Sequence, residues 1–148
     1  MFHLVLKFYD MKDEKFYKIT ILLAALGTVF ASFLFYNFLT KPSVEVCTIN
    51  EQVNCDAVTK GDLATLFGVP VSFVGLVGYV CVLAAAFFKN KKVILAVAAF
   101  GMLFCLRLTF LELFSIKIVC PVCLACQIDM LVLFLLSTLA NFKKPQTW

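Results

Sequence analysis

The sequence predicts an all-α integral membrane protein, with residues 1–148 folding as a single domain built from a bundle of four transmembrane helices. Composition is the first observation: 63% of the residues are hydrophobic and only 15% are charged, against roughly 45–50% and about 25% in soluble domains. The second is a series of four long apolar runs, and the third is the gathering of lysines between alternate runs. This composition excludes a soluble globular enzyme. It also excludes a disordered chain, which needs low hydrophobicity and high charge.

The four apolar runs define the expected helices, which cover about residues 19–39, 69–88, 93–113 and 122–140. About 20 residues at 1.5 Å each cross a hydrocarbon core of about 30 Å, and only a helix satisfies the backbone hydrogen bonds of each run there. We expect the first run to be retained rather than cleaved as a signal peptide. It is too long for a signal sequence, and no A-x-A-like site follows Leu39.

The lysines predict how the bundle is oriented. One set lies before the first run, between the second and third, and after the fourth: Lys7, Lys12, Lys15, Lys18, Lys89, Lys91, Lys92, Lys143 and Lys144. The positive-inside rule then places both termini in the cytoplasm. It places the loop of about residues 40–68 and the connection 114–121 on the extracytoplasmic side, where only Lys41, Lys60 and Lys117 lie.

The long loop ends in a segment that we expect to be a short amphipathic half-helix on the membrane surface. Leu63, Leu66 and Phe67 share one helical face by their spacing of three and four residues. Such a helix would lie in the interface with its apolar side down. Gly68 and Pro70 would end it and begin the second span.

Four of the seven cysteines fall on the predicted extracytoplasmic side: Cys47 and Cys55 in the loop, and Cys120 and Cys123 at the start of the fourth helix. Disulfides persist in that compartment. The C-x-x-C lies at a helix N-terminus, where unpaired N–H groups and the helix dipole stabilise a thiolate, the species that attacks a disulfide. For Cys47 and Cys55 a redox-active pair is favoured, and a structural disulfide that pins the loop is the alternative.

The other cysteines and the only histidine are not expected to do chemistry. Cys81 and Cys105 lie deep in the second and third runs and are interpreted as small core hydrophobes. Cys126 extends the motif to C-x-x-C-x-x-C, but no fourth cysteine follows as iron–sulfur ligation would need, so we expect it to pack beside Cys123. His3 lies far from the cysteines, which leaves thiols and a bound cofactor to carry the chemistry.

Several motifs together resemble the vitamin K epoxide reductase family in its bacterial or archaeal form. The resemblance covers nearly the whole chain, in motif order, spacing and four-span layout. The residues that carry it are the pair Cys47-x7-Cys55 with Asp56-Ala57-Val58, the run Leu66-Phe67-Gly68-Val69-Pro70-Val71-Ser72 followed by Gly75, Gly78 and Tyr79, and Glu112-Leu113-Phe114 leading into Cys120-Pro121-Val122-Cys123.

The resemblance implies a thiol–quinone oxidoreductase that supports disulfide bond formation in a prokaryotic plasma membrane. A reduced thioredoxin-like protein would attack the loop disulfide at Cys47, Cys55 would exchange with Cys120, and Cys123 would reduce a quinone, either ubiquinone, menaquinone or a relative. These 148 residues contain no thioredoxin-like domain, so the partner is expected to be a separate extracytoplasmic protein. The implied quinone contacts are Phe67, Val71, Ser72, Gln127 and Arg107.

Two departures from the family pattern weaken any assignment of epoxide reduction. Val71 stands where animal members have an asparagine that hydrogen-bonds the quinone head, and Gln127 stands where they have a tyrosine. The alternatives are vitamin K quinone or epoxide reduction by the same relay, and a non-catalytic tetraspan scaffold with a loop disulfide. A metal transporter would need polar residues through the bundle, so we expect no metal, and we expect no nucleic acid.

Two charged residues fall inside the apolar runs at similar depth, Arg107 in the third and Asp129 in the fourth. Ionisable groups at such depth are expensive and usually face a partner. An Arg107–Asp129 ion pair is geometrically possible. The alternatives are that Arg107 reaches Glu112, snorkels to the interface, or contacts a quinone carbonyl.

Overall fold

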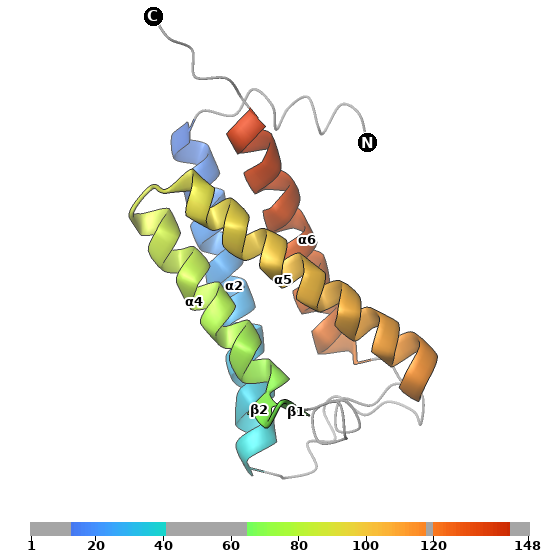
Figure 1. The fold of residues 1–148 in the computed structure, drawn as a ribbon. Helices are drawn as coiled ribbons and strands as arrows, with labels where there is room; N and C mark the ends of the chain where they lie inside the picture. Colours follow the sequence, from blue (N-terminus) through green and yellow to red (C-terminus); the bar gives the residue numbers. More distant parts are fainter. Residues whose placement is uncertain (1–12, 41–64, 118–119, 143–148) are drawn as a thin grey trace, which may run out of the picture.

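The computed structural model describes residues 13–40, 65–117 and 120–142, and within them it shows four helices, one short hairpin and one π-helical turn. The helices run alternately up and down (Figure 1), which confirms the predicted all-α membrane bundle. The elements are α2 (Asp13–Thr40), β1 (Thr65–Leu66), β2 (Val69–Pro70), α4 (Val71–Phe87), α5 (Lys91–Leu111), η3 (Glu112–Ile116) and α6 (Pro121–Phe142).

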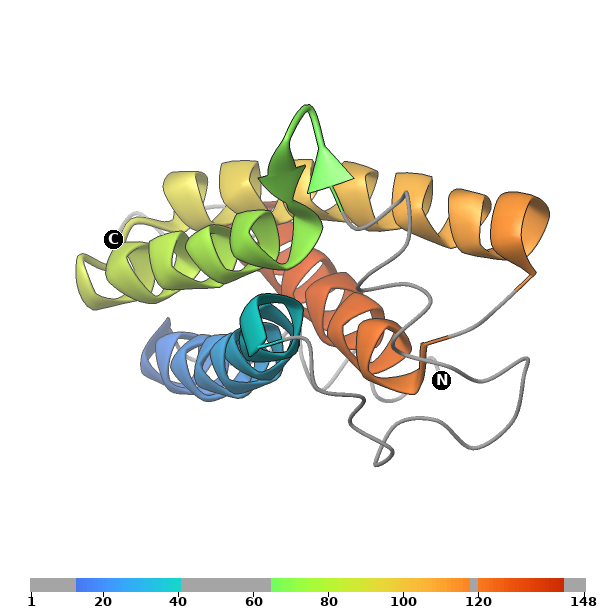
Figure 2. The same ribbon diagram turned by 90° about the horizontal axis from the view of Figure 1, so that it is seen from below.

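The four helices close into a ring in which α2 packs on α4, α4 on α5, α5 on α6 and α6 on α2. The contact between α2 and α4 is the most extensive. Seen from below, α6 lies between α2 and α5, and the β1–β2 hairpin projects from the start of α4 (Figure 2). Every helix thus has two neighbours, and a shared interior runs along the bundle.

By length and composition, three of these helices can cross a membrane: α2, α5 with the start of η3, and α6. Helix α4 is apolar but has only 17 residues, at the lower end of the roughly 17–25 residues that a span uses. It is shorter than the apolar run because Val69 and Pro70 form strand β2 and Phe88 caps the helix.

A three-residue turn joins α4 to α5. The Lys89 and Asn90 amides donate to the carbonyls of Ala86 and Ala85 at 3.1 and 3.0 Å, and Lys89 has a φ of 53°, the pattern of a Schellman motif with a left-handed residue after the helix. Asn90 then caps α5, its side chain accepting from the Val93 amide at 3.3 Å. The chain therefore reverses within residues 88–90.

Polar contacts tie this turn to the start of α2 and the end of α6. The Tyr17 hydroxyl donates to the Lys89 carbonyl at 2.7 Å, Lys91 pairs with Asp13 at 2.7 Å, and the Asn141 amide donates to the Lys91 carbonyl at 3.0 Å. We call this part of the bundle the lysine end, and the opposite part, where α6 begins, the C-x-x-C end. The lysines of the described residues on this side, Lys15, Lys18, Lys89, Lys91 and Lys92, thus lie at one end, while the cytoplasmic placement of that end stays a prediction.

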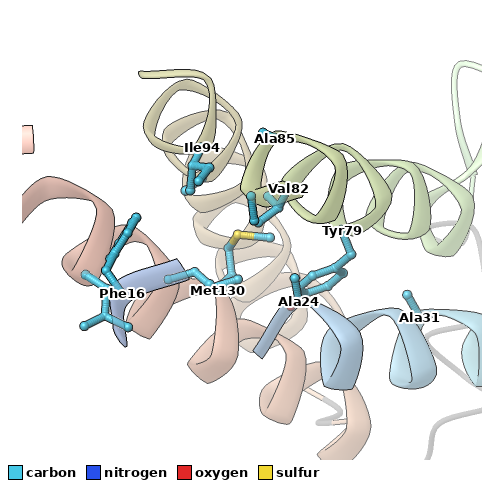
Figure 3. Packing of buried hydrophobic residues seen from close by; sticks show 12 residues of the cluster. Phe16, Ala24, Ala31, Tyr79, Val82, Ala85, Ile94 and Met130 are labelled. Atoms are coloured by element: carbon cyan, nitrogen blue, oxygen red, sulfur yellow. The ribbon is translucent and has the colours of Figure 1, made fainter. Parts of the chain in front are cut away.

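Small residues bring α2 close to the rest of the bundle. Its buried positions recur every three or four residues, as they do along a helix seam: Thr20, Ala24, Gly27, Ala31 and Leu34. Figure 3 shows Ala24 and Ala31 on α2 beside Tyr79 of α4, in the same cluster as Met130 of α6. Small side chains at such positions let transmembrane helices approach closely.

Gly27 is the tightest point of this seam, because a Cβ there would overlap the ring of Tyr79. The hydroxyl of the same tyrosine donates to the Cys126 carbonyl on α6 at 3.0 Å. One side chain of α4 therefore fixes the positions of α2 and α6.

The expected half-helix over Leu63, Leu66 and Phe67 is wrong where the structure describes it. Residues 63–64 lie outside the described residues, but Thr65 and Leu66 pair with Pro70 and Val69 as antiparallel strands. Phe67 and Gly68 between them have φ values of 52° and 84°, and two positive φ values in a row belong to a tight hairpin turn rather than to a helix. Local turn chemistry at Gly68 outweighs an apolar pattern of only three residues.

Substituting Gly27 tests this packing. Gly27→Ala should destabilise the bundle by about 1–3 kcal/mol, the usual cost of overpacking a core, because the Tyr79 ring must move. The control is Gly78→Ala on α4, where no atom lies within 4 Å of the added Cβ, so we expect stability to be unchanged or slightly raised. Thermal unfolding of both purified variants in one detergent measures the difference, and equal midpoints would contradict the packing.

Candidate functional site

The first sulfur of the C-x-x-C caps helix α6. Cys120 immediately precedes Pro121 and is completely buried, and its Sγ accepts from the Cys123 amide at 3.4 Å. This is the bond that an N-cap side chain normally makes to the third helical residue, and Pro121 stands at the first helical position, where no N–H is needed. The motif thus lies at a helix N-terminus, as the sequence predicts, in a setting that stabilises a thiolate.

An apolar cavity of about 580 Å³ occupies the bundle interior and borders the motif. All four helices, β2 and η3 contribute to its wall, and a volume of this size is typical of ligand sites, which span roughly 300–1,000 Å³. Few of the lining residues carry a polar or reactive atom. They are Ser72, Tyr79, Cys81, Cys105, Glu112, Cys123, Cys126 and Gln127.

The two cysteines of the motif have different surroundings. Cys123 lines the cavity and Cys120 does not. Cys120 packs in a small cluster with Leu34, against which Val122, Cys123 and Cys126 also lie. A molecule in the cavity can therefore contact Cys123, while the Cys120 sulfur lies at the N-terminus of α6.

Gln127 supplies a polar group to the same wall, one helical turn beyond Cys123. The Thr109 hydroxyl donates to Gln127 Oε1 at 2.7 Å, and the Gln127 Nε2 atom is buried without a hydrogen-bond partner among the described residues. A buried donor left unpaired costs roughly 1–3 kcal/mol. A ligand with an acceptor atom would recover that cost.

Two carboxyl groups are buried in this half of the bundle. Glu112 is 5% exposed and lines the cavity, and its Oε1 has no partner among the described residues. Asp129 is 7% exposed and is not part of the cavity wall. The Tyr79 hydroxyl lies beside the Asp129 carboxyl but donates to the Cys126 carbonyl.

Of the implied quinone contacts, the structure brings Val71, Ser72 and Gln127 to the cavity and leaves two outside it. Phe67 forms the tip of the hairpin and is 99% exposed. Arg107 is exposed on α5, on the same side as Leu103, Leu106 and Phe110. Neither side chain borders the cavity.

The Arg107–Asp129 ion pair is not formed. Both Asp129 oxygens lack a hydrogen-bond partner among the described residues, while Arg107 lies on the outward face of α5. Counting helix rise gave the two residues the same depth, but depth says nothing about rotation around the helix axis. The position of Arg107 leaves snorkelling toward the interface as the arrangement that fits.

Of the three cysteines that were expected to be packing residues, the structure confirms two. Cys105 and Cys126 are half-buried and pack against the core clusters as predicted, but Cys81 is exposed on α4 and also borders the cavity. Interpreting Cys81 as a core residue was therefore wrong. Cys47 and Cys55 lie outside the described residues, so their redox role stays a prediction.

The sequence reasoning did not single out Glu112 or Tyr79 as site residues, although both belong to the motifs that carry the resemblance. A signal was present for Glu112. Cys105, Leu108 and Glu112 follow one another at three- and four-residue spacing, which places them on one helix face, and all three line the cavity.

A comparison with curated proteins gives no match. The model of the vitamin K epoxide reductase family matches residues 18–138, a range that contains the C-x-x-C motif and all four helices except the first turn of α2 and the last turn of α6. The chain therefore belongs to the vitamin K epoxide reductase family, and is an integral membrane oxidoreductase of a quinone-linked kind.

Proposed function

We propose that this protein oxidises an extracytoplasmic thioredoxin-like protein and passes the electrons through two cysteine pairs to a membrane quinone, in support of disulfide bond formation. The observation that carries the proposal is that the Cys123 thiol and the unpaired Gln127 amide nitrogen share one apolar cavity. A tetraspan scaffold with a structural loop disulfide needs neither feature.

The residues of the cavity fit a quinone. The wall is almost entirely apolar, which suits a flat ring with an isoprenoid tail, and Gln127 Nε2 can donate to a carbonyl oxygen of the ring. A quinone bound there accepts two electrons and two protons and leaves as the hydroquinone. Val71, Ser72 and Tyr79 from α4 would hold the ring against α6.

The cysteines carry electrons by thiol–disulfide exchange, in which a thiolate attacks a disulfide and forms a mixed disulfide. The partner dithiol reduces the Cys47–Cys55 disulfide and becomes a disulfide itself. The loop dithiol then reduces the Cys120–Cys123 disulfide, with Cys55 attacking Cys120. The Cys120–Cys123 disulfide re-forms when the pair gives two electrons and two protons to the quinone.

The position of Cys120 at the N-terminus of α6 supports this order. When Cys55 attacks Cys120, Cys123 leaves as the thiolate, and Cys47 then attacks Cys55 and releases Cys120. The Cys120 sulfur accepts the Cys123 amide at 3.4 Å at the N-terminus of α6, so it is a good leaving group in this second exchange, since a stabilised thiolate leaves faster. Cys123 is the member of the C-x-x-C pair that borders the cavity. The member of the pair that the relay assigns to the quinone is thus the one that borders the cavity.

The extracytoplasmic location of the relay is tested by labelling. A membrane-impermeant maleimide added to intact, reduced cells should modify Cys47 or Cys55, because the lysine end is predicted to face the cytoplasm. Peptide mapping by mass spectrometry identifies the modified cysteine. Labelling that occurs only after lysis would reverse the topology.

Trapped intermediates test the order of the relay. A Cys55→Ala variant should accumulate a covalent complex with the partner through Cys47, because the loop then has no resolving thiol. A Cys123→Ala variant should accumulate an internal Cys55–Cys120 disulfide and lose quinone reduction. Non-reducing gels and peptide mapping distinguish the two species by the mass of the partner.

The control for these variants is Cys81→Ala, which changes a cysteine of α4 that belongs to neither proposed pair and should turn over normally. A partner attached to Cys120 in the Cys55→Ala variant would show that the loop pair is a structural disulfide. Full turnover by Cys123→Ala would contradict the assignment of the cavity thiol.

A further inference from the structure

Reduction in the cavity requires proton movement as well as electron movement. Oxidising two thiols to a disulfide releases two electrons and two protons, and the hydroquinone binds two of each. The protons must move inside a cavity whose wall is almost entirely apolar. A side chain that accepts a proton from sulfur and hands it to oxygen is therefore needed within reach of Cys123, because general acid–base groups act at hydrogen-bond distance.

The candidates for this role are few among the described residues. The chain has a single histidine, His3, in the segment before α2, and Lys117 is exposed at the end of η3. The carboxyl groups of Glu112 and Asp129 are buried in this half of the bundle, and of the two only Glu112 lines the cavity. Its burial of more than nine-tenths and its unpartnered Oε1 point to an interaction with something that enters the cavity.

The Glu112 carboxyl is also placed near the sulfurs. It lies close enough to interact electrostatically with the thiols of Cys105, Cys120 and Cys123. It begins η3, the π-helical turn that follows α5, and such turns are frequent at functional sites. A buried acceptor without a donor costs free energy, and the proton of a neighbouring thiol would satisfy Oε1.

We propose that Glu112 is the proton carrier of the cavity, taking the proton of the Cys123 thiol and delivering it to the quinone oxygen. This inference rests on the proposed function. The Cys123 proton passes to Glu112 Oε1, and the sulfur pair gives two electrons as the Cys120–Cys123 bond forms. The carboxyl gives its proton to one ring oxygen, then carries the Cys120 proton to the other. Both thiol protons are thereby used, and no further reactant is needed.

The kinetic test compares two isosteric changes of buried carboxyl groups. Glu112→Gln keeps the shape of the side chain but cannot exchange a proton, so kcat for quinone reduction should fall about 10²-fold or more, the usual contribution of a general acid–base group, with KM little changed. The matched control is Asp129→Asn, which removes the carboxyl outside the cavity wall and should keep kcat. Gln127→Leu should instead raise KM, since it removes a proposed binding contact.

A second readout uses quinone-free protein and follows alkylation of Cys123 by a small permeant maleimide, read by peptide mapping. Only the thiolate reacts. If Glu112 takes the Cys123 proton, Glu112→Gln slows alkylation. If Glu112 is a bystander with a negative charge, the same change removes a like charge beside the thiolate and speeds alkylation. Faster or unchanged alkylation would overturn the inference.

The two proposals fail in different ways. Wild-type protein that reduces no quinone would contradict the proposed function, even if Glu112→Gln slows Cys123 alkylation. If the Glu112→Gln variant turns over as fast as the wild-type protein, the role of Glu112 as proton carrier is contradicted but the proposed function is not. Glu112→Asp keeps the carboxyl on a shorter chain and should recover part of both rates. It also keeps the test decisive if the glutamine variant does not fold.

Discussion

The contact of the Tyr79 ring with Gly27 is the constraint on which the rest of the bundle depends. The ring occupies the space that any larger residue at position 27 would fill, and its hydroxyl holds the Cys126 carbonyl at 3.0 Å. The contact fixes α2, α4 and α6 relative to one another. Tyr79 also forms part of the cavity wall, so the packing that assembles the helices shapes the site as well.

The second constraint is that polar atoms are scarce inside the bundle, so it matters for each one whether it has a hydrogen-bond partner. In a membrane the hydrophobic effect contributes little to helix association. Close packing and hydrogen bonds between helices stabilise the bundle instead. Tyr79 and Thr109 use their hydroxyl groups within the protein. Gln127 Nε2 and Glu112 Oε1 do not, and both residues border the cavity beside Cys123. Thr20 Oγ1 and both Asp129 oxygens also lack partners among the described residues, but they lie outside the cavity wall. Two unsatisfied groups that border a cavity next to a thiol are what a site for a polar-headed redox ligand requires.

The sequence predicted the fold class and the placement of the C-x-x-C motif, because apolar runs and helix N-termini leave local signals. Helix ends agreed to within two residues, except that α2 begins about six residues earlier than expected, at Asp13. The expected half-helix failed because residues beside Gly68 formed a hairpin that three apolar positions could not exclude. Arg107 was misplaced because depth was counted without rotation, although Leu103, Leu106 and Phe110 share its outward face. The Gly27–Tyr79 contact could not be predicted, since which glycine meets which ring depends on how two distant segments cross.

Photoaffinity labelling tests most directly whether the cavity beside Cys123 is the quinone site. A photoreactive azidoquinone illuminated with the purified protein should label cavity-lining peptides of α4 and α6, including the one that contains Cys123 and Gln127. Excess ubiquinone or menaquinone should suppress the labelling. Label confined to the outward face of α5 around Leu103 and Phe110, and unaffected by competing quinone, would show that quinones meet only the lipid-facing surface and would contradict the account.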